Sequence, residues 1–558
     1  MKVNKYTVTI AVTMVLYFCI FTGFSYLSPG GDWLSHVMGI KTATDNDPGG
    51  PYVISAVDLL EHDKALFVGH PGLTLQYFLY GILTSWYHFS NSDSAFSFQA
   101  YVARNLDRAF FWSKIGMSLL NLISFALLFY FSSLLFEREI AAIATLLYMT
   151  SFPAMLYFSK ISPEPLIVIV FVAILIIFYK IHDRSISLNS FSGISAAVCL
   201  AFLSMAAIFT KLNLMLATPL IAMCFIVYTG WTTARESRIS YFSIIHVPLI
   251  FLLSAVGFFF LFSFKINWRE FFAYWNGVLR GDYHAHATSK GQLNLIQFIS
   301  YNTLEMIREY LIHIKIFVTE DLFHHFRTNS RSSLNVITEW SLVVTSIVGA
   351  CYYIARNRNR LIFWTWPGLF LAINLLFYIV KPVYNYLFLF QVIFSIFAAY
   401  GLSGMIDKYL DKSRINRNYL IAIAIIFIHY LSIYSVINSR FDDVKMYRSR
   451  CKPYYEAVKK LDHDQKLGVV FAGIKPTIEL PLELSWDFVD QRSNIRREVA
   501  STYVLIDKNT FSSFESKEEI DAYFKINRIG YIIEAEADGQ PIGDYVSTDR
   551  WIRNYYER

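Results

Sequence analysis

Two groups of polar residues near the N-terminus have side chains that could do acid–base and phosphate chemistry. Asp45 and Asp47 lie in a Thr-Asp-Asn-Asp-Pro sequence after the first apolar stretch, and His70 follows in a His-Pro-Gly sequence. A carboxylate can take a proton from an attacking hydroxyl. A histidine can give a phosphate a hydrogen bond. The chemistry open to these residues depends on the segments that position them.

The composition predicts a membrane protein. The chain has 558 residues, of which 55% are hydrophobic and 16% charged, and its mean hydropathy is +0.39. One soluble core would not need so many apolar residues. Segments 241–264 and 361–380 contain no Asp, Glu, Lys or Arg. At 1.5 Å per residue, each can cross a hydrocarbon layer of about 30 Å. Carboxylates beside such segments favour an enzyme that handles a lipid-linked substrate.

Apolar runs of this length recur along most of the chain and predict a mainly α-helical, polytopic fold. Eleven spans are expected, near 6–28, 109–136, 140–159, 164–181, 190–210, 212–231, 241–264, 335–354, 361–380, 383–403 and 419–437. Segment 71–89 also lacks charged residues and is long enough to span. The flanking basic residues must decide whether it does.

The basic residues predict the sidedness of these spans. If segment 71–89 does not cross, one side receives twelve Lys and Arg in short loops and the other only three. Because cytoplasmic loops carry the excess of Lys and Arg, the twelve are placed in the cytoplasm and segment 71–89 is predicted to be an interfacial or re-entrant helix. The N-terminus is then cytoplasmic, in the cytoplasmic (inner) membrane. Three long segments lie outside: 29–108, 265–334 and 438–558.

Residues 438–558 are predicted to form a small extracytoplasmic, periplasmic α/β domain beside a transmembrane domain at 1–437. Helical and strand patterns alternate there, at Tyr454–Leu461, Lys466–Ala472, Thr502–Ile506, Lys517–Phe524 and Gly530–Glu534. The five cysteines fall almost entirely within spans, so no disulfide framework or zinc cluster is expected. Cytoplasmic loops explain the net charge of +6, which gives no indication of nucleic-acid binding.

Further polar residues are expected at the outer ends of the spans. Glu164 follows a Lys-Ile-Ser-Pro sequence there, and Lys211 ends a charge-free span. A lysine would cost roughly 3 kcal/mol at mid-bilayer, so Lys211 is placed at the boundary. There it could bind a phosphate or snorkel to lipid headgroups. Tyr384 and Tyr386 come at the outer end of a later span, where tyrosines are also common interfacial anchors.

The order and sidedness of these groups resemble the GT-C superfamily of integral-membrane glycosyltransferases. The resemblance is to the branch that contains protein O-mannosyltransferases and the lipid A aminoarabinose transferase, and it covers roughly residues 1–440 in layout. The motifs that carry it are Asp45-Asn46-Asp47, His70-Pro71, Pro163-Glu164 and Tyr384-Asn385-Tyr386. The resemblance implies a polyprenyl-phosphate sugar donor used on the outer face, membrane lipids as surroundings, and inversion at the anomeric carbon. It also implies a donor-site contact at His70.

Sugar transfer from a lipid phosphate needs fewer acids than glycoside hydrolysis. A base must take the proton of the acceptor hydroxyl. The phosphate departs without a proton, so one base and cationic contacts are enough, whereas a hydrolase ordinarily needs two carboxylates. Asp47 is preferred as the base over Asp45 because it precedes a Pro-Gly-Gly turn that could lead into a helix. Either acid could instead be a turn or N-cap residue.

The remaining site residues are assigned by charge and position. Glu164 is expected to orient Lys211 or a loop backbone, and Arg280 is a further candidate for the donor phosphate. Asp45 and Asp47 also form an Asp-x-Asp pattern that could hold an optional divalent cation, although no cofactor is required. The acceptor could be a glycolipid, a polysaccharide or a protein.

Three other functions share parts of this pattern. A secondary transporter would place charged or broken helices at mid-membrane, whereas here the ionisable residues gather at one face. A polysaccharide polymerase or ligase would also have lipid-linked substrates and large outer loops. An oligosaccharyltransferase usually has a Trp-Trp-Asp signature in a large C-terminal domain. Trp486-Asp487 alone does not match that signature.

Overall fold

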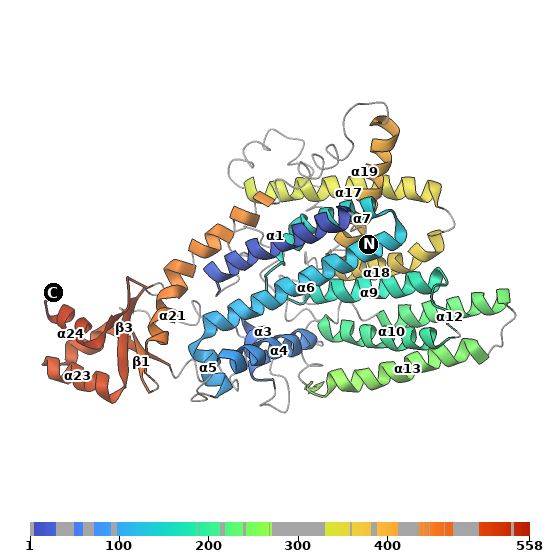
Figure 1. The fold of residues 1–558 in the computed structure, drawn as a ribbon. Helices are drawn as coiled ribbons and strands as arrows, with labels where there is room; N and C mark the ends of the chain where they lie inside the picture. The colour runs from blue at the N-terminus through green and yellow to red at the C-terminus, as the bar shows by residue number, and fades with distance from the viewer. Residues whose placement is uncertain are drawn as a thin grey trace, which may run out of the picture.

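Long helices make up most of the described part of the chain in a computed structural model (Figure 1). The structure describes residues 5–29, 49–59, 72–90, 97–188, 190–211, 218–237, 242–266, 268–269, 330–357, 360–380, 388–410, 433–434, 436–438, 440–445, 447–462, 464–471, 502–536 and 541–557. Within these ranges the fold is mainly α-helical with one small sheet, as the sequence predicts.

Five described helices are long and apolar enough to cross a membrane. They are α1 (Lys5–Leu27), α6 (Leu106–Leu135), α9 (Glu164–His182), α10 (Phe191–Thr210) and the Ile245–Ser263 part of α13 (Phe242–Ser263). Four further helices occupy predicted spans: α12 (Thr218–Ser237), α17 (Ser330–Arg356), α18 (Leu361–Val380) and α19 (Phe388–Leu410). The chain is therefore a multi-pass membrane protein. The count of eleven spans and their orientation stay predictions, and most of segment 419–437 lies outside the described residues.

The predicted span 140–159 is wrong as a continuous helix. Helix α7 (Arg138–Met149) ends after 12 residues, and a separate short helix, α8 (Phe152–Leu156), follows it. Pro153 has no backbone N–H to continue the α7 hydrogen-bond ladder, which accounts for the break. At 1.5 Å per residue α7 extends about 18 Å, well short of a hydrocarbon layer of about 30 Å.

Segment 71–89 contains the helix that the sequence predicts, α4 (Leu73–Ser90). Its buried Leu75, Leu79 and Leu83 recur every four residues and so lie on one face. Helix α4 packs against α6 and α10 and also against two short helices, α3 (Gly49–Val57) and α5 (Phe98–Arg104). Figure 1 shows α3, α4 and α5 together near the start of α6. Whether α4 lies at the membrane interface stays a prediction.

The C-terminal region has a four-stranded sheet in the order β2-β1-β3-β4. Strand β1 (Lys466–Phe471) is parallel to β2 (Tyr503–Asp507) and to β3 (Ile529–Ala535), and β3 is antiparallel to β4 (Val546–Ser547). Three helices accompany the sheet: α21 (Lys452–Lys459), α23 (Lys517–Ile526) and α24 (Thr548–Glu557). The predicted strands and helices are thus confirmed, while β4 and α24 are additional.

The two faces of this sheet pack against different partners. Alternate residues of β1 point to opposite faces, so Val470 joins a cluster with Phe511 and Trp551, whereas Leu467 and Val469 join the cluster that contains α3, α4, α5 and α6. Helix α21 belongs to the cluster that contains Leu467 and Val469. The C-terminal α/β unit therefore shares a hydrophobic core with the helices at the start of α6. A domain boundary at residues 437–438 stays a prediction.

Candidate functional site

A buried ion pair joins the start of α9 to the end of α10. The Lys211 ammonium donates a hydrogen bond to Glu164 Oε1 at 2.5 Å, and the two side chains are 6% and 0% exposed. Glu164 is in the first turn of α9, where a carboxylate interacts favourably with the helix dipole. Lys211 is the extended C-cap of α10, so its side chain leaves the helix where the last carbonyls favour a cation. The structure thus places together two residues that the sequence assigns to the site.

The first turn of α4 lies against the end of α10. The hydroxyl oxygens of Thr74 and Thr210 are 2.5 Å apart, and the Thr210 hydroxyl also donates to the Ala206 carbonyl at 2.6 Å. Thr210 immediately precedes Lys211, and α4 begins three residues after His70. The chain therefore leads from His70 into a helix that contacts the backbone beside the Lys211–Glu164 pair.

Helix α3 packs closely on the beginning of α4. A Cβ atom built on Gly72 would lie 2.2 Å from the Tyr52 ring, so only glycine permits this approach. The Ser55 hydroxyl donates to Gln76 Oε1 at 2.7 Å, which ties the helices one turn further along. Helix α3 begins two residues after Asp47. The starts of α3, α4 and α9, the residues 159–163 that lead into α9, and the end of α10 thus form one neighbourhood, called here the helix-end cluster.

Two serines in the helix-end cluster are polar groups that the sequence reasoning did not assign. Ser159 and Ser162 flank Lys160 before α9, and within the described residues neither buried hydroxyl has a hydrogen-bond partner. A buried hydroxyl without a partner costs about 1–3 kcal/mol, so both are candidates to bind a polar ligand. Lys160 is 2% exposed, and its ammonium lies 5.5 Å from the centroid of the Tyr157 ring. The Ser-Lys-Ile-Ser sequence between two apolar segments is the pattern that could have indicated these two serines.

Asp58 is a second group missed by the sequence reasoning. It follows α3 and is only 1% exposed, although apolar residues surround it in the sequence. A buried ionisable group beside the helix-end cluster belongs among the candidate site residues. No local pattern predicts the burial of Asp58, since it depends on the packing of α3 against α4.

The other predicted site residues lie outside the part of the chain that the structure describes. These are Asp45, Asp47, His70, Arg280, Tyr384 and Tyr386. Their assignments as base, donor contacts and site residues stay predictions. So does the optional cation at Asp45 and Asp47, and the described residues contain no group of three or more His, Cys, Asp or Glu side chains that could hold a metal ion.

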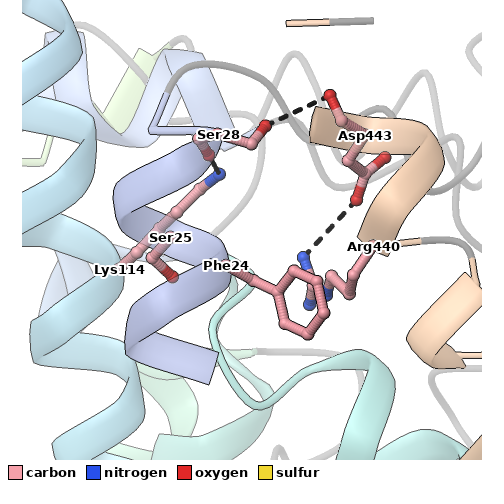
Figure 2. Close-up of a pocket in the computed structure, with 6 residues that line it drawn as sticks. All are labelled: Phe24, Ser25, Ser28, Lys114, Arg440 and Asp443. Carbon is pink, nitrogen blue, oxygen red and sulfur yellow. Dashed lines mark hydrogen bonds and ion pairs between the residues drawn. The ribbon is translucent and has the colours of Figure 1, made fainter. Parts of the chain in front are cut away.

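A second polar cluster lines a small pocket where α1 meets α6 (Figure 2). The Lys114 ammonium donates to the Ser28 carbonyl at 3.0 Å, and the Ser28 hydroxyl donates to the Asp443 carbonyl at 3.3 Å. Arg440 pairs with the Asp443 carboxylate at 3.7 Å and donates to the Leu156 carbonyl at 3.1 Å. These contacts join four segments that are distant in the sequence. The cluster was also missed, because Lys114 lies within a predicted span.

Comparison with known proteins gives matches only among solved structures: no protein-family model and no curated protein matches the chain. The apo oligosaccharyltransferase of Archaeoglobus fulgidus is 13% identical with a TM-score of 0.42, over 94% of this chain and 69% of that one. ArnT from Cupriavidus metallidurans bound to undecaprenyl phosphate is 13% identical with a TM-score of 0.42, over 95% and 93%. AglB from A. fulgidus with an inhibitory peptide and a dolichol-phosphate is 12% identical with a TM-score of 0.39, over 94% and 69%.

Proposed function

We propose that this protein is a glycosyltransferase that moves a sugar from a polyprenyl-phosphate donor to an acceptor hydroxyl at the outer face of the cytoplasmic membrane. The observation that carries the proposal is the buried Lys211–Glu164 pair beside the starts of α3 and α4. Helix α3 follows Asp47 and α4 follows His70. A cation is therefore buried close to the helices that follow the predicted base and the predicted donor contact.

The ion pair is better explained by binding than by stability. Removing two charges from water costs several kcal/mol per ion, so a buried pair is often no more stabilising than apolar residues of the same size. A pre-positioned ammonium is useful when a phosphate must bind and then leave as an anion, because the cation stabilises the charge that develops. Glu164 holds the Lys211 ammonium at 2.5 Å and so orients it. The Ser162 hydroxyl has no hydrogen-bond partner among the described residues and could donate a hydrogen bond to an oxygen of the sugar donor.

The proposed reaction is a single displacement. Asp47, or Asp45 in the alternative assignment, takes the proton of the acceptor hydroxyl as its oxygen attacks the anomeric carbon. The bond from that carbon to the phosphate oxygen breaks, and its electron pair leaves with the polyprenyl phosphate. The anomeric configuration is therefore inverted. His70, Arg280, Tyr384 and Tyr386 are assigned to the donor and sugar site, and a divalent cation at Asp45 and Asp47 is optional.

The test is glycan mass spectrometry of cells that carry Asp47→Asn, Asp45→Asn or the unchanged protein, at matched expression. Loss of one sugar mass in Asp47→Asn, with little change in Asp45→Asn, is expected. The lost mass would identify the sugar, and loss of an oligosaccharide would favour a ligase or an oligosaccharyltransferase instead. Unchanged glycans in both variants would exclude these aspartates as the base.

A further inference from the structure

A segment between the helical bundle and the C-terminal sheet contacts both ends of the predicted first outer loop, 29–108. This segment, residues 440–462, is called the strap here, and its residues 440–445 and 447–462 are described. It contains a helical stretch from 440, a π-helical turn (Tyr447–Cys451) and α21. In Figure 1 the strap is the orange segment leading to β1. It thus lies between the proposed catalytic region and the sheet.

The first part of the strap binds the end of α1, where the loop begins. The Ser28 hydroxyl donates to the Asp443 carbonyl at 3.3 Å, and the Phe24 and Phe441 rings meet edge to face with centroids 5.2 Å apart. Figure 2 shows Ser28 between Lys114 of α6 and Asp443 of the strap. The residue at the start of the loop is therefore fixed from both sides.

The last part of the strap binds α5 and α6, where the loop ends. Lys459 forms an ion pair with Asp107, and the Arg104 guanidinium donates to the carbonyls of Leu461 and Asp462 at 3.3 and 3.1 Å. Burial, and to a smaller extent the charge of the Asp107 carboxylate, raise the pKa of Tyr447 in the strap. The Asp107 side chain is 10% exposed and the Lys459 side chain 32% exposed, so the ion pair is partly shielded from water.

The strap also reaches the segments next to the helix-end cluster. The Arg440 guanidinium donates to the carbonyl of Leu156, four residues before Lys160. Cys451 and Tyr454 of the strap are fully buried in the same hydrophobic cluster as Tyr52 and Val53 of α3. Holding both ends of a segment reduces the conformations open to it. The strap thus contacts the segment that precedes Lys160 and shares a hydrophobic cluster with α3.

We propose that the strap is a positioning element for sugar transfer, and that its Lys459–Asp107 ion pair holds α3 and α4 in register with Glu164 and Lys211. This inference rests on the proposed function. Lys459 and Asp107 touch no reacting atom in this proposal; they act through the placement of α3 and α4. Because a small misplacement of reacting groups can cost as much as about 100-fold in rate, loss of the ion pair should lower kcat more than substrate affinity.

The experiment uses the full chain in lipid nanodiscs with a polyprenyl-phosphate sugar. Lys459→Met should lower kcat about tenfold and leave the donor KM within about twofold, whereas Lys459→Arg, which keeps the charge, should retain activity. The matched control is Lys525→Met, which removes the lysine of the exposed Lys525–Asp521 pair of α23 and should change nothing. Hydrogen exchange of the α3 amides should become faster in Lys459→Met only.

The two proposals fail in different ways. An unchanged kcat in Lys459→Met would overturn the positioning role. So would a fall in kcat that is equally large in Lys459→Met and in Lys459→Arg. A wild-type protein that transfers no sugar would overturn the proposed function. In that case unchanged exchange of the α3 amides in Lys459→Met would separately show that the strap does not hold the loop.

Discussion

The charged residues of the helix-end cluster and those of the C-terminal unit are in opposite environments. Glu164 and Lys211 are 0% and 6% exposed, whereas the Lys525 and Asp521 side chains of α23 are 75% and 37% exposed. Surface ion pairs contribute little, and buried ones cost desolvation that their attraction only partly offsets. The exposed pair of α23 can therefore contribute little to the stability of the C-terminal unit, while the buried charges of the bundle need a reason other than stability.

The largest effect is expected from Lys211→Met. The variant leaves the Glu164 carboxylate buried without its ammonium partner, which should destabilise the protein by about 3–5 kcal/mol. Thermal unfolding in detergent or nanodiscs measures the loss. The matched double variant Lys211→Met with Glu164→Gln removes both charges and should recover most of the stability. Equal destabilisation in both variants would contradict the account of the buried pair.

A comparable loss of stability, caused by a cavity and not by an unpaired charge, is expected from Phe511→Ala in the C-terminal unit. The Phe511 ring is 1% exposed, and its centroid lies 4.6 Å from that of Trp551 and 5.7 Å from that of Phe524. Truncation should cost about 3–5 kcal/mol through the cavity it leaves. Hydrogen exchange should locate the loss in β2, α23 and α24. Exchange that rises equally in α9 and α10 would contradict a separate apolar core for this face of the sheet.

A smaller effect is expected from Gly72→Ala. The added methyl group would lie 2.2 Å from the Tyr52 ring, so α3 and α4 must move apart, at a cost of about 1–3 kcal/mol. Tyr52→Leu in the same chain should restore part of the unfolding temperature by making room. If Gly72→Ala is as stable as wild type, the close contact of α3 with α4 is wrong.

The smallest effect is expected from Lys525→Met. Both partners of its ion pair face solvent, and water screens their attraction. The unfolding temperature should not change measurably, in contrast to Lys211→Met. A clear loss of stability would show that surface charges hold the C-terminal unit and would remove the contrast between the two regions.

Local patterns in the sequence predicted most of the described helices and strands. Apolar run length and alternation are properties of neighbouring residues, so α10 and the strand at Lys466–Phe471 were predictable. The break between α7 and α8 was missed because hydropathy outweighed the effect of Pro153. The short β4 was missed because two residues carry no periodic signal.

The candidate site was predictable only where the position of a residue along a predicted span indicated its depth in the membrane. Glu164 and Lys211 lie at the same end of adjacent spans, so their proximity could be inferred. The contact of Arg440 with Leu156 bridges 284 residues of sequence, and no local pattern encodes it. Asp58 was missed for the same reason, since its burial depends on packing between helices.

The central claim is that the buried ammonium of Lys211 serves sugar transfer. The most direct measurement compares transfer from a polyprenyl-phosphate sugar by the wild-type protein and by the folded Lys211→Met, Glu164→Gln double variant, both in nanodiscs. The double variant is expected to unfold at nearly the wild-type temperature yet to transfer sugar at least about 100-fold more slowly, because it has lost a cation that stabilises developing charge. Wild-type transfer rates in the double variant would contradict the central claim.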